Sequence, residues 1–173
     1  MWRRPGERFS DNCIREQDKH RGGSVMVWGA IDLQEKSDLI IVDGTLNAEQ
    51  YLEQVINPTV VPLFVRRPNL VFMHDNARPH AARLTTAHLA NMGIPVIPWP
   101  SKSPDLNPIE HLWDELERRI RNRPNLPTSL QQLQDAILEE WEAIPREVWR
   151  KLIFSMRKRC QAVVTAYGGH TKY

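Results

Sequence analysis

Residues 70–80, Leu-Val-Phe-Met-His-Asp-Asn-Ala-Arg-Pro-His, are the stretch that decides the fold of this 173-residue chain. The apolar run from Leu70 to His74 is typical of a buried strand, and Asp75 follows it directly. In open α/β sheets, ligands bind beyond the carboxyl ends of the strands. We therefore predict an α/β fold with Asp75 at the ligand-binding edge of the sheet.

Residues 99–110, Trp-Pro-Ser-Lys-Ser-Pro-Asp-Leu-Asn-Pro-Ile-Glu, place a second acid at the start of a helix. Asn107 is the expected N-cap and Pro108 the first helical residue, because these residue types are favoured at those positions. Since Asp75 and Glu110 lie on two rigid elements, we expect their carboxylates to meet in space. Apolar residues then recur at helical spacing, at Ile109, Leu112, Trp113, Leu116 and Ile120.

Each acid also has a simpler role available. Asp75 precedes Asn76, and such a pair favours a turn at the end of a strand. Glu110 follows Asn107 at the spacing of the reciprocal glutamate in a helix capping box. These roles are compatible with metal binding, since a capping hydrogen bond would also orient Glu110.

The first half of the chain predicts a hairpin and a helix. Residues 24–31 and 38–42 are rich in apolar and β-branched residues, and a short polar turn joins them, which indicates two antiparallel strands. Asn47 followed by Gln50 is a capping-box pattern that starts a helix. We expect Pro58 and Pro62 to interrupt this helix.

The second half predicts further helices around one short strand. A helix over residues 81–92 is expected to end at Gly93, and residues 94–97 then form a short strand. The helix that carries Glu110 should end near Pro124, and Thr128 with Gln131 should cap the next one. A last helix is expected from Pro145, with this apolar face buried: Val148, Trp149, Leu152, Ile153, Met156 and Val163.

The length and the 41% hydrophobic content suit one globular domain. We expect an irregular basic arm over residues 1–23. The domain itself is expected over residues 24–173, with its C-terminal helices beginning at about residue 128.

Four segments of the chain closely resemble the Tc/mariner superfamily of cut-and-paste DNA transposases. They are residues 74–80, the Trp-Pro and Ser-Pro-Asp-Leu-Asn-Pro-Ile-Glu parts of residues 99–110, residues 23–29 (Gly-Ser-Val-Met-Val-Trp-Gly) and residues 168–173 (Gly-Gly-His-Thr-Lys-Tyr). The resemblance spans nearly the whole chain. It implies a ribonuclease H-like fold and a catalytic Asp, Asp, Glu triad, in which Asp75 and Glu110 match the second and third acids.

The first acid of the triad has no match in this chain. In the family it ends an apolar strand upstream of a segment like residues 2–8, Trp-Arg-Arg-Pro-Gly-Glu-Arg, and this chain begins just before that segment. We therefore expect a ribonuclease H-like fold that lacks its first central strand. The strands at residues 24–31 and 70–74 would then each keep unpaired backbone groups along one edge.

The resemblance also implies the cofactor. Family members use magnesium or manganese, with two ions in the intact site, and Asp75 and Glu110 would be both metal ligands and catalytic residues. Two such ions stabilise the entering and leaving oxygens during attack on a phosphodiester. Because the missing acid normally bridges both ions, we expect weak metal retention and little or no strand cleavage or transfer from this chain alone. Whether the chain by itself is an enzyme therefore stays open.

The formal net charge of +2 says little about nucleic acid, because the footprint of a DNA-binding protein is a local basic face. Basic residues gather near the start of the chain, at residues 118–123 and at residues 146–159. On charge alone these are equally typical of solvated surfaces. The resemblance favours DNA, both transposon ends and target, and implies a possible homodimer and a nuclear location. The contacts expected with DNA are Arg3, Arg4, Lys19, Arg21, Arg118 and Arg119.

No apolar stretch reaches membrane-spanning length, and the Arg-rich start lacks the apolar core of a secretory signal. We expect a soluble, intracellular protein without a membrane partner.

Two other functions remain open. The chain could be a non-catalytic nucleic-acid-binding protein derived from a transposase. It could also be an unrelated metal hydrolase, because His74, His80 and His111 flank the two acids and histidine is a common zinc or iron ligand. Against the hydrolase, a regular strand would turn His74 to the side opposite Asp75, and His80 and His111 have polar surface roles available.

Overall fold

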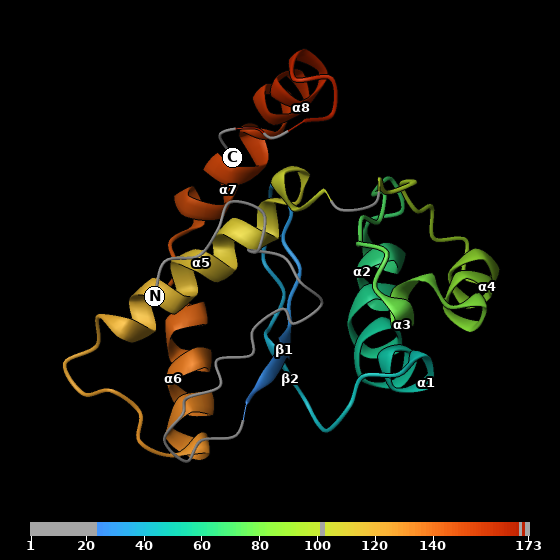
Figure 1. Ribbon diagram of the computed structural model, residues 1–173. Helices are drawn as coiled ribbons and strands as arrows, with labels where there is room; N and C mark the ends of the chain where they lie inside the picture. Colours follow the sequence, from blue (N-terminus) through green and yellow to red (C-terminus); the bar gives the residue numbers. More distant parts are fainter. Residues whose placement is uncertain (1–23, 101–102, 170, 172–173) are drawn as a thin grey trace. The chain divides into compact units, whose positions relative to one another are not determined.

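The structure is a computed structural model that describes residues 24–100, 103–169 and 171 (Figure 1). These residues form two compact units. We call the unit made of residues 26–28 and 40–100 the Asp75 unit. The unit made of residues 24–25, 29–39 and the described residues from 103 onward is called the Glu110 unit.

The predicted hairpin is present in the Asp75 unit. Strands β1 (Met26–Trp28) and β2 (Ile40–Val42) pair antiparallel, with Met26 opposite Val42 and Trp28 opposite Ile40. Both strands are rich in β-branched or aromatic residues, which pack well on a pleated surface. Among the described residues, β1 pairs with β2 alone.

A helical run follows, and its winding changes along its length. Helix α1 (Ala48–Tyr51) begins with the predicted capping box, in which Asn47 and Gln50 bond each other's backbone N–H. A π-helical segment, η2 (Leu52–Val60), and helix α2 (Val61–Arg66) continue the run. The expected interruption is therefore wrong. Pro58 lies inside the wider π winding, and Pro62 lies just after the winding changes from π to α, so the run continues past both prolines.

The helix predicted over residues 81–92 is present as α4 (Arg83–Asn91). A short helix that was not predicted, α3 (Arg78–Ala81), precedes it, and the extended backbone of Ala82 separates the two. Gly93 ends α4 as predicted. Its φ of +66° is a left-handed conformation that favours glycine. The Gly93 and Ile94 N–H groups then bond the carbonyls of Ala90 and Leu89, which is the Schellman pattern at a helix end.

The segment predicted as a strand before Asp75 forms only an isolated parallel bridge, between Phe72 and Val96. Phe72 N–H donates to the Pro95 carbonyl at 2.7 Å, and Ile97 N–H donates to the Phe72 carbonyl at 2.9 Å. In the described part of the chain, no strand is paired between this segment and β1. The ladder is thus shorter than the apolar run suggested.

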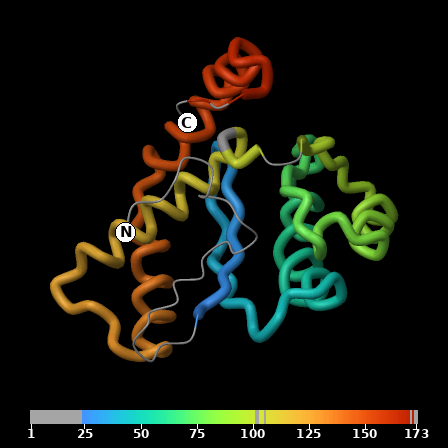
Figure 2. Tube along the Cα trace, in the orientation of Figure 1, coloured from blue at the N-terminus to red at the C-terminus, as the bar shows by residue number. Residues whose placement is uncertain are grey.

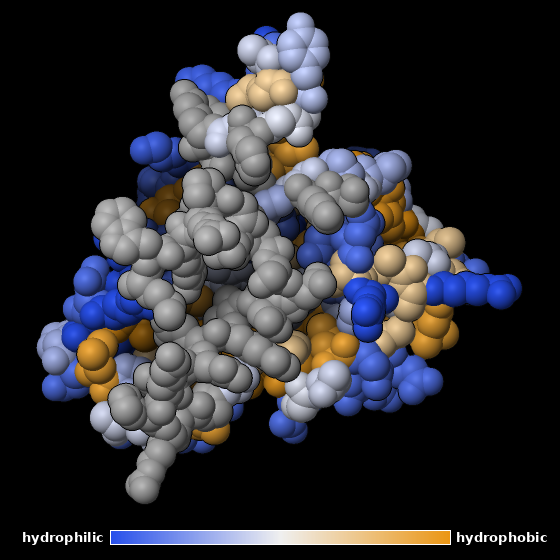
Figure 3. Space-filling model, viewed as in Figure 1, coloured by the Kyte–Doolittle hydropathy of each residue, from blue (hydrophilic) through white to orange (hydrophobic). Residues whose placement is uncertain are grey.

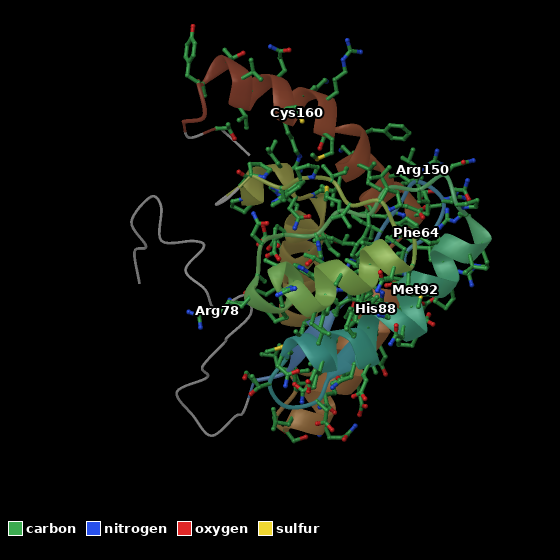
Figure 4. The ribbon with its side chains drawn as sticks, turned by 90° about the vertical axis from the view of Figure 1, so that its right-hand side faces the viewer. Phe64, Arg78, His88, Met92, Arg150 and Cys160 are labelled. Atoms are coloured by element: carbon green, nitrogen blue, oxygen red, sulfur yellow. The ribbon has the colours of Figure 1, made fainter. Side chains whose placement is uncertain are left out.

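The core of the Asp75 unit lies where the helical run meets this bridge. Tyr51, Val55 and Ile56 are fully buried and pack with Phe72 and Leu89. On α4, His88 Nε2 lies 2.7 Å from Asn57 Oδ1, which ties this helix to η2 (Figure 4). Asp75 is therefore attached to a packed helical core. The visible face of the molecule shows apolar residues in small patches among hydrophilic ones (Figure 3).

The Glu110 unit is helical. A 3₁₀ turn, η3 (Pro104–Leu106), leads into α5 (Pro108–Arg121), which ends close to Pro124 as predicted, and α6 (Leu130–Glu142) follows (Figure 2). The cap of α6 is Ser129, which accepts from Gln132 N–H at 3.2 Å, so the prediction of Thr128 was one residue early. No helix in the described part of the chain combines the length and apolar character needed to cross a membrane.

The last predicted helix is divided in two at Ser155, giving α7 (Arg146–Phe154) and α8 (Met156–Thr165). Ser155 Oγ donates to the Leu152 carbonyl at 2.6 Å, a local bond that competes with regular helix. Of the predicted buried face, Trp149 is buried and the other five members are half-buried, with Met156 and Val163 on α8.

Tryptophans join the loop of the hairpin to the helices of the Glu110 unit. Trp141 Nε1–H donates to the Ser37 carbonyl at 2.9 Å, and Trp149 Nε1–H donates to the Asp32 carbonyl at 3.1 Å. Gly29 lies against the rings of Trp113 and Trp141, so close that a Cβ there would be 3.0 Å from Trp141. This packing fixes α6 and α7 against residues 29–39.

Candidate active site

Asp75 lies at the turn between the Phe72 bridge and α3. Its Oδ1 accepts the Ala77 N–H at 3.0 Å, the geometry of an Asx turn, so the turn-forming role considered for Asp75 is present. The same Oδ1 lies 2.6 Å from Nδ1 of His80. Within the described residues, both hydrogen bonds of this carboxylate end on Oδ1, and its side chain is 42% exposed. Oδ2 therefore stays available to a further ligand.

His80 comes from α3 and lies between two other rings. The Tyr51 ring centroid is 4.3 Å from that of His80, and the His74 ring stacks on it at 5.1 Å with an interplanar angle of 12°. Tyr51 is fully buried, and its hydroxyl lies 3.4 Å from His74 Nδ1. The expected surface role of His80 is wrong, because its side chain is only 15% exposed and is the direct partner of Asp75.

The electrostatics of this cluster follow from burial and from the Asp75–His80 contact. The hydrogen bond from His80 holds the pKa of Asp75 below its ordinary value, against the opposing effect of partial burial. Burial, together with the neighbouring His80, lowers the pKa of His74 to about 4. Burial also raises the pKa of Tyr51. At neutral pH Asp75 is therefore a carboxylate, and His74 and Tyr51 are uncharged.

Glu110 lies in the first turn of α5. Asn107 is the N-cap residue as predicted, but its side chain makes no capping bond and instead reaches Glu110 Oε1 at 3.4 Å. The Asn107 N–H bonds the Pro104 carbonyl, so Glu110 does not complete a capping box. Asp75 and Glu110 belong to different units, and the meeting of their carboxylates stays a prediction.

The alternative of a histidine-rich metal hydrolase gains no support. Among the described residues, no group of three or more His, Cys, Asp or Glu side chains could hold a metal ion. Zinc sites commonly use three or four protein ligands, whereas magnesium is often held by one or two carboxylates with waters and phosphate.

Of the basic residues expected to contact DNA, Arg118 and Arg119 lie on α5, and Arg3, Arg4, Lys19 and Arg21 lie outside the described residues. Both arginines on α5 bond the carboxylate of Glu115, with Arg119 Nε at 2.8 Å. Burial acts to raise the pKa of Glu115, but these two hydrogen bonds hold it below its ordinary value. Arg118 is 65% exposed and Arg119 26%.

A family model described as DDE superfamily endonuclease matches residues 1–134, a range that includes Asp75 and Glu110. The chain belongs to this family. The match confirms the resemblance inferred from the residues around the two acids.

Curated relatives agree with this assignment. The transposase of the transposable element Tc1 from Caenorhabditis elegans is 40% identical over 176 residues, and that of Tcb1 from Caenorhabditis briggsae is 40% identical over 182. Each alignment covers 99% of this chain and 63% of the relative. The chain thus spans less than two thirds of the length of these relatives.

Solved structures confirm the fold. The catalytic domain of Mos1 transposase, in a structure with raltegravir and Mg, has a TM-score of 0.75 at 23% identity, covering 86% of this chain and 78% of that one. The Mos1 mariner paired-end complex with Mn has a TM-score of 0.73 at 23% identity, covering 99% of this chain and 51% of that one. The predicted ribonuclease H-like fold is therefore correct.

Reasoning from the sequence missed the partners of Asp75. His80 and His74 were considered as ligands of a different metal, and Tyr51 was considered only as part of a helix face. A signal was present, because a histidine in the first turn after an Asx turn can reach back to the aspartate that forms it. The aromatic packing of Tyr51 depends on tertiary contacts and had no sequence signal.

Proposed function

We propose that this chain is catalytic-domain sequence of a cut-and-paste DNA transposase, with DNA as its substrate and Mg²⁺ or Mn²⁺ as its cofactor. The observation that carries the proposal is the Asp75 carboxylate, which is partly exposed and which the described residues hold through Oδ1, leaving Oδ2 for a ligand. The hydrogen bond from His80 also holds the pKa of Asp75 below its ordinary value. Asp75 lies inside the range matched by a family of endonucleases.

The donor chemistry of Asp75 and Glu110 fits such a cofactor. Hard divalent cations prefer carboxylate oxygens and fill the rest of their shell with waters and substrate phosphate. Asp75 would bind through Oδ2, and Glu110 would supply the second protein carboxylate. A pair of these ions, when bound, would stabilise the entering and leaving oxygens of an in-line attack on a phosphodiester.

The substrate side of the proposal comes from the relatives. The Tc1 and Tcb1 proteins carry the name transposase, and Mos1 has been captured in paired-end complexes. We infer that this chain also acts on transposon ends and target DNA. Two copies assembled on paired ends, and a location in the nucleus, belong to the same proposal.

Iron-directed cleavage of the protein tests whether the two acids share a cation. Fe²⁺ can replace Mg²⁺ at carboxylate sites, and with ascorbate and peroxide it cuts the backbone beside the ion. We expect cuts near residue 75 and near residue 110 in the same titration, mapped by mass spectrometry. Asp75→Asn should weaken both sets of cuts by at least about tenfold, the scale on which even outer-shell partners of a metal act.

Matched controls separate a site from general binding to surface acids. Asp43→Asn removes an exposed acid from the Asp75 unit, and Glu117→Gln removes one from α5. Both variants should cleave like the original chain. If cleavage near residue 75 is as strong in Glu110→Gln as in the original chain, the two carboxylates bind cations separately. That result would contradict the proposal.

A further inference from the structure

We propose that His80 is a positioning residue for Asp75: it holds one oxygen of this carboxylate so that the other binds the divalent cation. The inference rests on the proposed function, because it takes Asp75 to be a metal ligand. It adds that His80 orients this ligand, and that the rings of Tyr51 and His74 hold His80 in place.

The hydrogen bond fixes the tautomer of His80. An ionised carboxylate can only accept, so at 2.6 Å the Nδ1 atom of His80 must carry the proton that is donated to Asp75. The Ala77 N–H donates to the same oxygen at 3.0 Å. Two donors on Oδ1 oppose rotation of the carboxylate and exchange of its oxygens, which a single backbone donor would oppose less.

The ring of His80 is itself held in place. Tyr51 lies at 4.3 Å from it and His74 stacks on it at 5.1 Å, so neighbouring rings restrict its rotation. Tyr51 is anchored in the core of the Asp75 unit, and His74 directly precedes Asp75 in the chain. The position of Asp75 is therefore coupled to the packed core through rigid aromatic rings. Side chains that hold a metal ligand through a second hydrogen bond are a general feature of metal sites.

Manganese titration in the absence of DNA tests the positioning role without any measurement of activity. Mn²⁺ broadens NMR signals near its binding site, and the broadening of the amide signals of residues 74–80 gives an apparent affinity even when binding is weak. His80→Ala removes the donor and should weaken this affinity by about tenfold, the lower end of the effect of outer-shell partners.

A conservative variant separates positioning from packing. In His80→Asn the side-chain amide can place an N–H near the position of Nδ1, so the affinity should stay within about threefold of the original. His88→Ala is the matched control, because His88 is a half-buried histidine of the same unit that bonds Asn57 instead of an acid. It should leave the affinity unchanged.

Three outcomes would overturn the inference. His80→Ala with unchanged affinity would show that the Ala77 N–H alone positions Asp75. Equal losses in His80→Asn and His80→Ala would indicate that His80 binds the ion itself. Nitrogen chemical shifts of the original chain that place the His80 proton on Nε2 would refute the donor role, even if both variants failed to fold.

Failure of the proposed function would look different. If Asp75→Asn leaves the broadening at residues 74–80 intact, Asp75 is not a metal ligand and both proposals are wrong. If Asp75→Asn abolishes it while His80→Ala does not weaken it, Asp75 keeps its role and only the inference about His80 is lost.

Discussion

The two units hold their acids in different ways. In the Asp75 unit, the carboxylate is fastened by side-chain and backbone donors, and aromatic rings fix the closer donor. In the Glu110 unit, Glu110 lies in the first turn of α5, and Asn107 Nδ2 lies 3.4 Å from Glu110 Oε1, which is long for a hydrogen bond. One acid thus lies in a turn between short elements, and the other is carried by the first turn of a 14-residue helix. Substitutions in each unit, and measurements of their effect on stability, should show which contacts support each acid.

The largest effect is expected from Trp141→Ala in the Glu110 unit. Trp141 is 1% exposed, stacks on Trp113 at 5.1 Å and bonds the Ser37 carbonyl. Its removal should lower the free energy of unfolding by about 3–5 kcal/mol, the usual range for a buried tryptophan cut to alanine. Urea denaturation followed by circular dichroism measures the change. A loss below about 1 kcal/mol would show that residues 29–39 are not clamped by this ring.

A smaller loss is expected when a methyl group is added at Gly29. Its Cβ would lie 3.0 Å from Trp141 and 3.1 Å from Trp113, both large buried or half-buried rings. Gly29→Ala should therefore cost about 1–3 kcal/mol by overpacking. The control is Gly44→Ala in the other unit, where no atom lies within 4 Å and only the φ of +70° opposes a side chain. This control should cost about 1 kcal/mol, the penalty of a left-handed backbone.

Equal losses for the two glycine variants would contradict the steric account of Gly29. A double variant, Gly29→Ala with Trp113→Leu, sharpens the result. If steric pressure from the rings is the cause, part of the loss should be recovered, because contacting residues do not behave additively.

Helix caps offer the next comparison. Asn47 accepts the Gln50 N–H at 2.9 Å, whereas the side chain of Asn107 makes no capping bond although it occupies the same position on α5. Asn47→Ala should cost about 1 kcal/mol, and Asn107→Ala should cost less than half of that. Thermal unfolding of both variants checks the order. The reverse order would mean that Asn107 stabilises the start of α5 through its contact with Glu110.

These caps also show what the sequence could predict. Asn47 with Gln50, the proline after Asn107 and Gly93 are local signals, and each marked its helix end correctly. Residues 70–74 were harder, because an apolar run shows that a segment is buried but not how many partners it pairs with. The division at Ser155 coincides with a local side-chain bond that propensity does not capture.

The residues of the candidate site also differ in how far the sequence could predict them. Asp75 and Glu110 were predicted as site residues because residue type, spacing and family motifs all pointed to them, and this stays a prediction. His80 was misjudged because its role depends on the turn at Ala77 and on the rings of Tyr51 and His74. Chemistry that depends on one residue is visible in a sequence, whereas support that brings Tyr51 against residues 74–80 is visible only after folding.

The smallest effect on stability, and a distinct effect on binding, is expected from the arginines of α5. Arg118 and Arg119 bond Glu115 near the surface, and such pairs contribute about 0–1 kcal/mol. Replacing both with alanine should therefore leave the free energy of unfolding nearly unchanged. If DNA phosphates replace Glu115 as their partner, the slope of log affinity against log salt should fall by about 1–2, because each lost phosphate contact removes nearly one unit.

The matched variant for this test is Arg123→Ala. Arg123 bonds Glu139 and Glu140 at 2.6 and 2.8 Å and so joins the segment just after α5 to α6. It should change stability more than the DNA salt slope. An unchanged slope in the Arg118→Ala, Arg119→Ala variant would remove both residues from the DNA interface. Their role would then rest on the ion pairs with Glu115 and on that of Arg119 with Glu140. That result would not touch the proposal for Asp75, because the proposed metal site and the proposed phosphate contacts are separate: contacts to backbone phosphates only position a protein on DNA, whereas the metal site would act on the reacting phosphodiester.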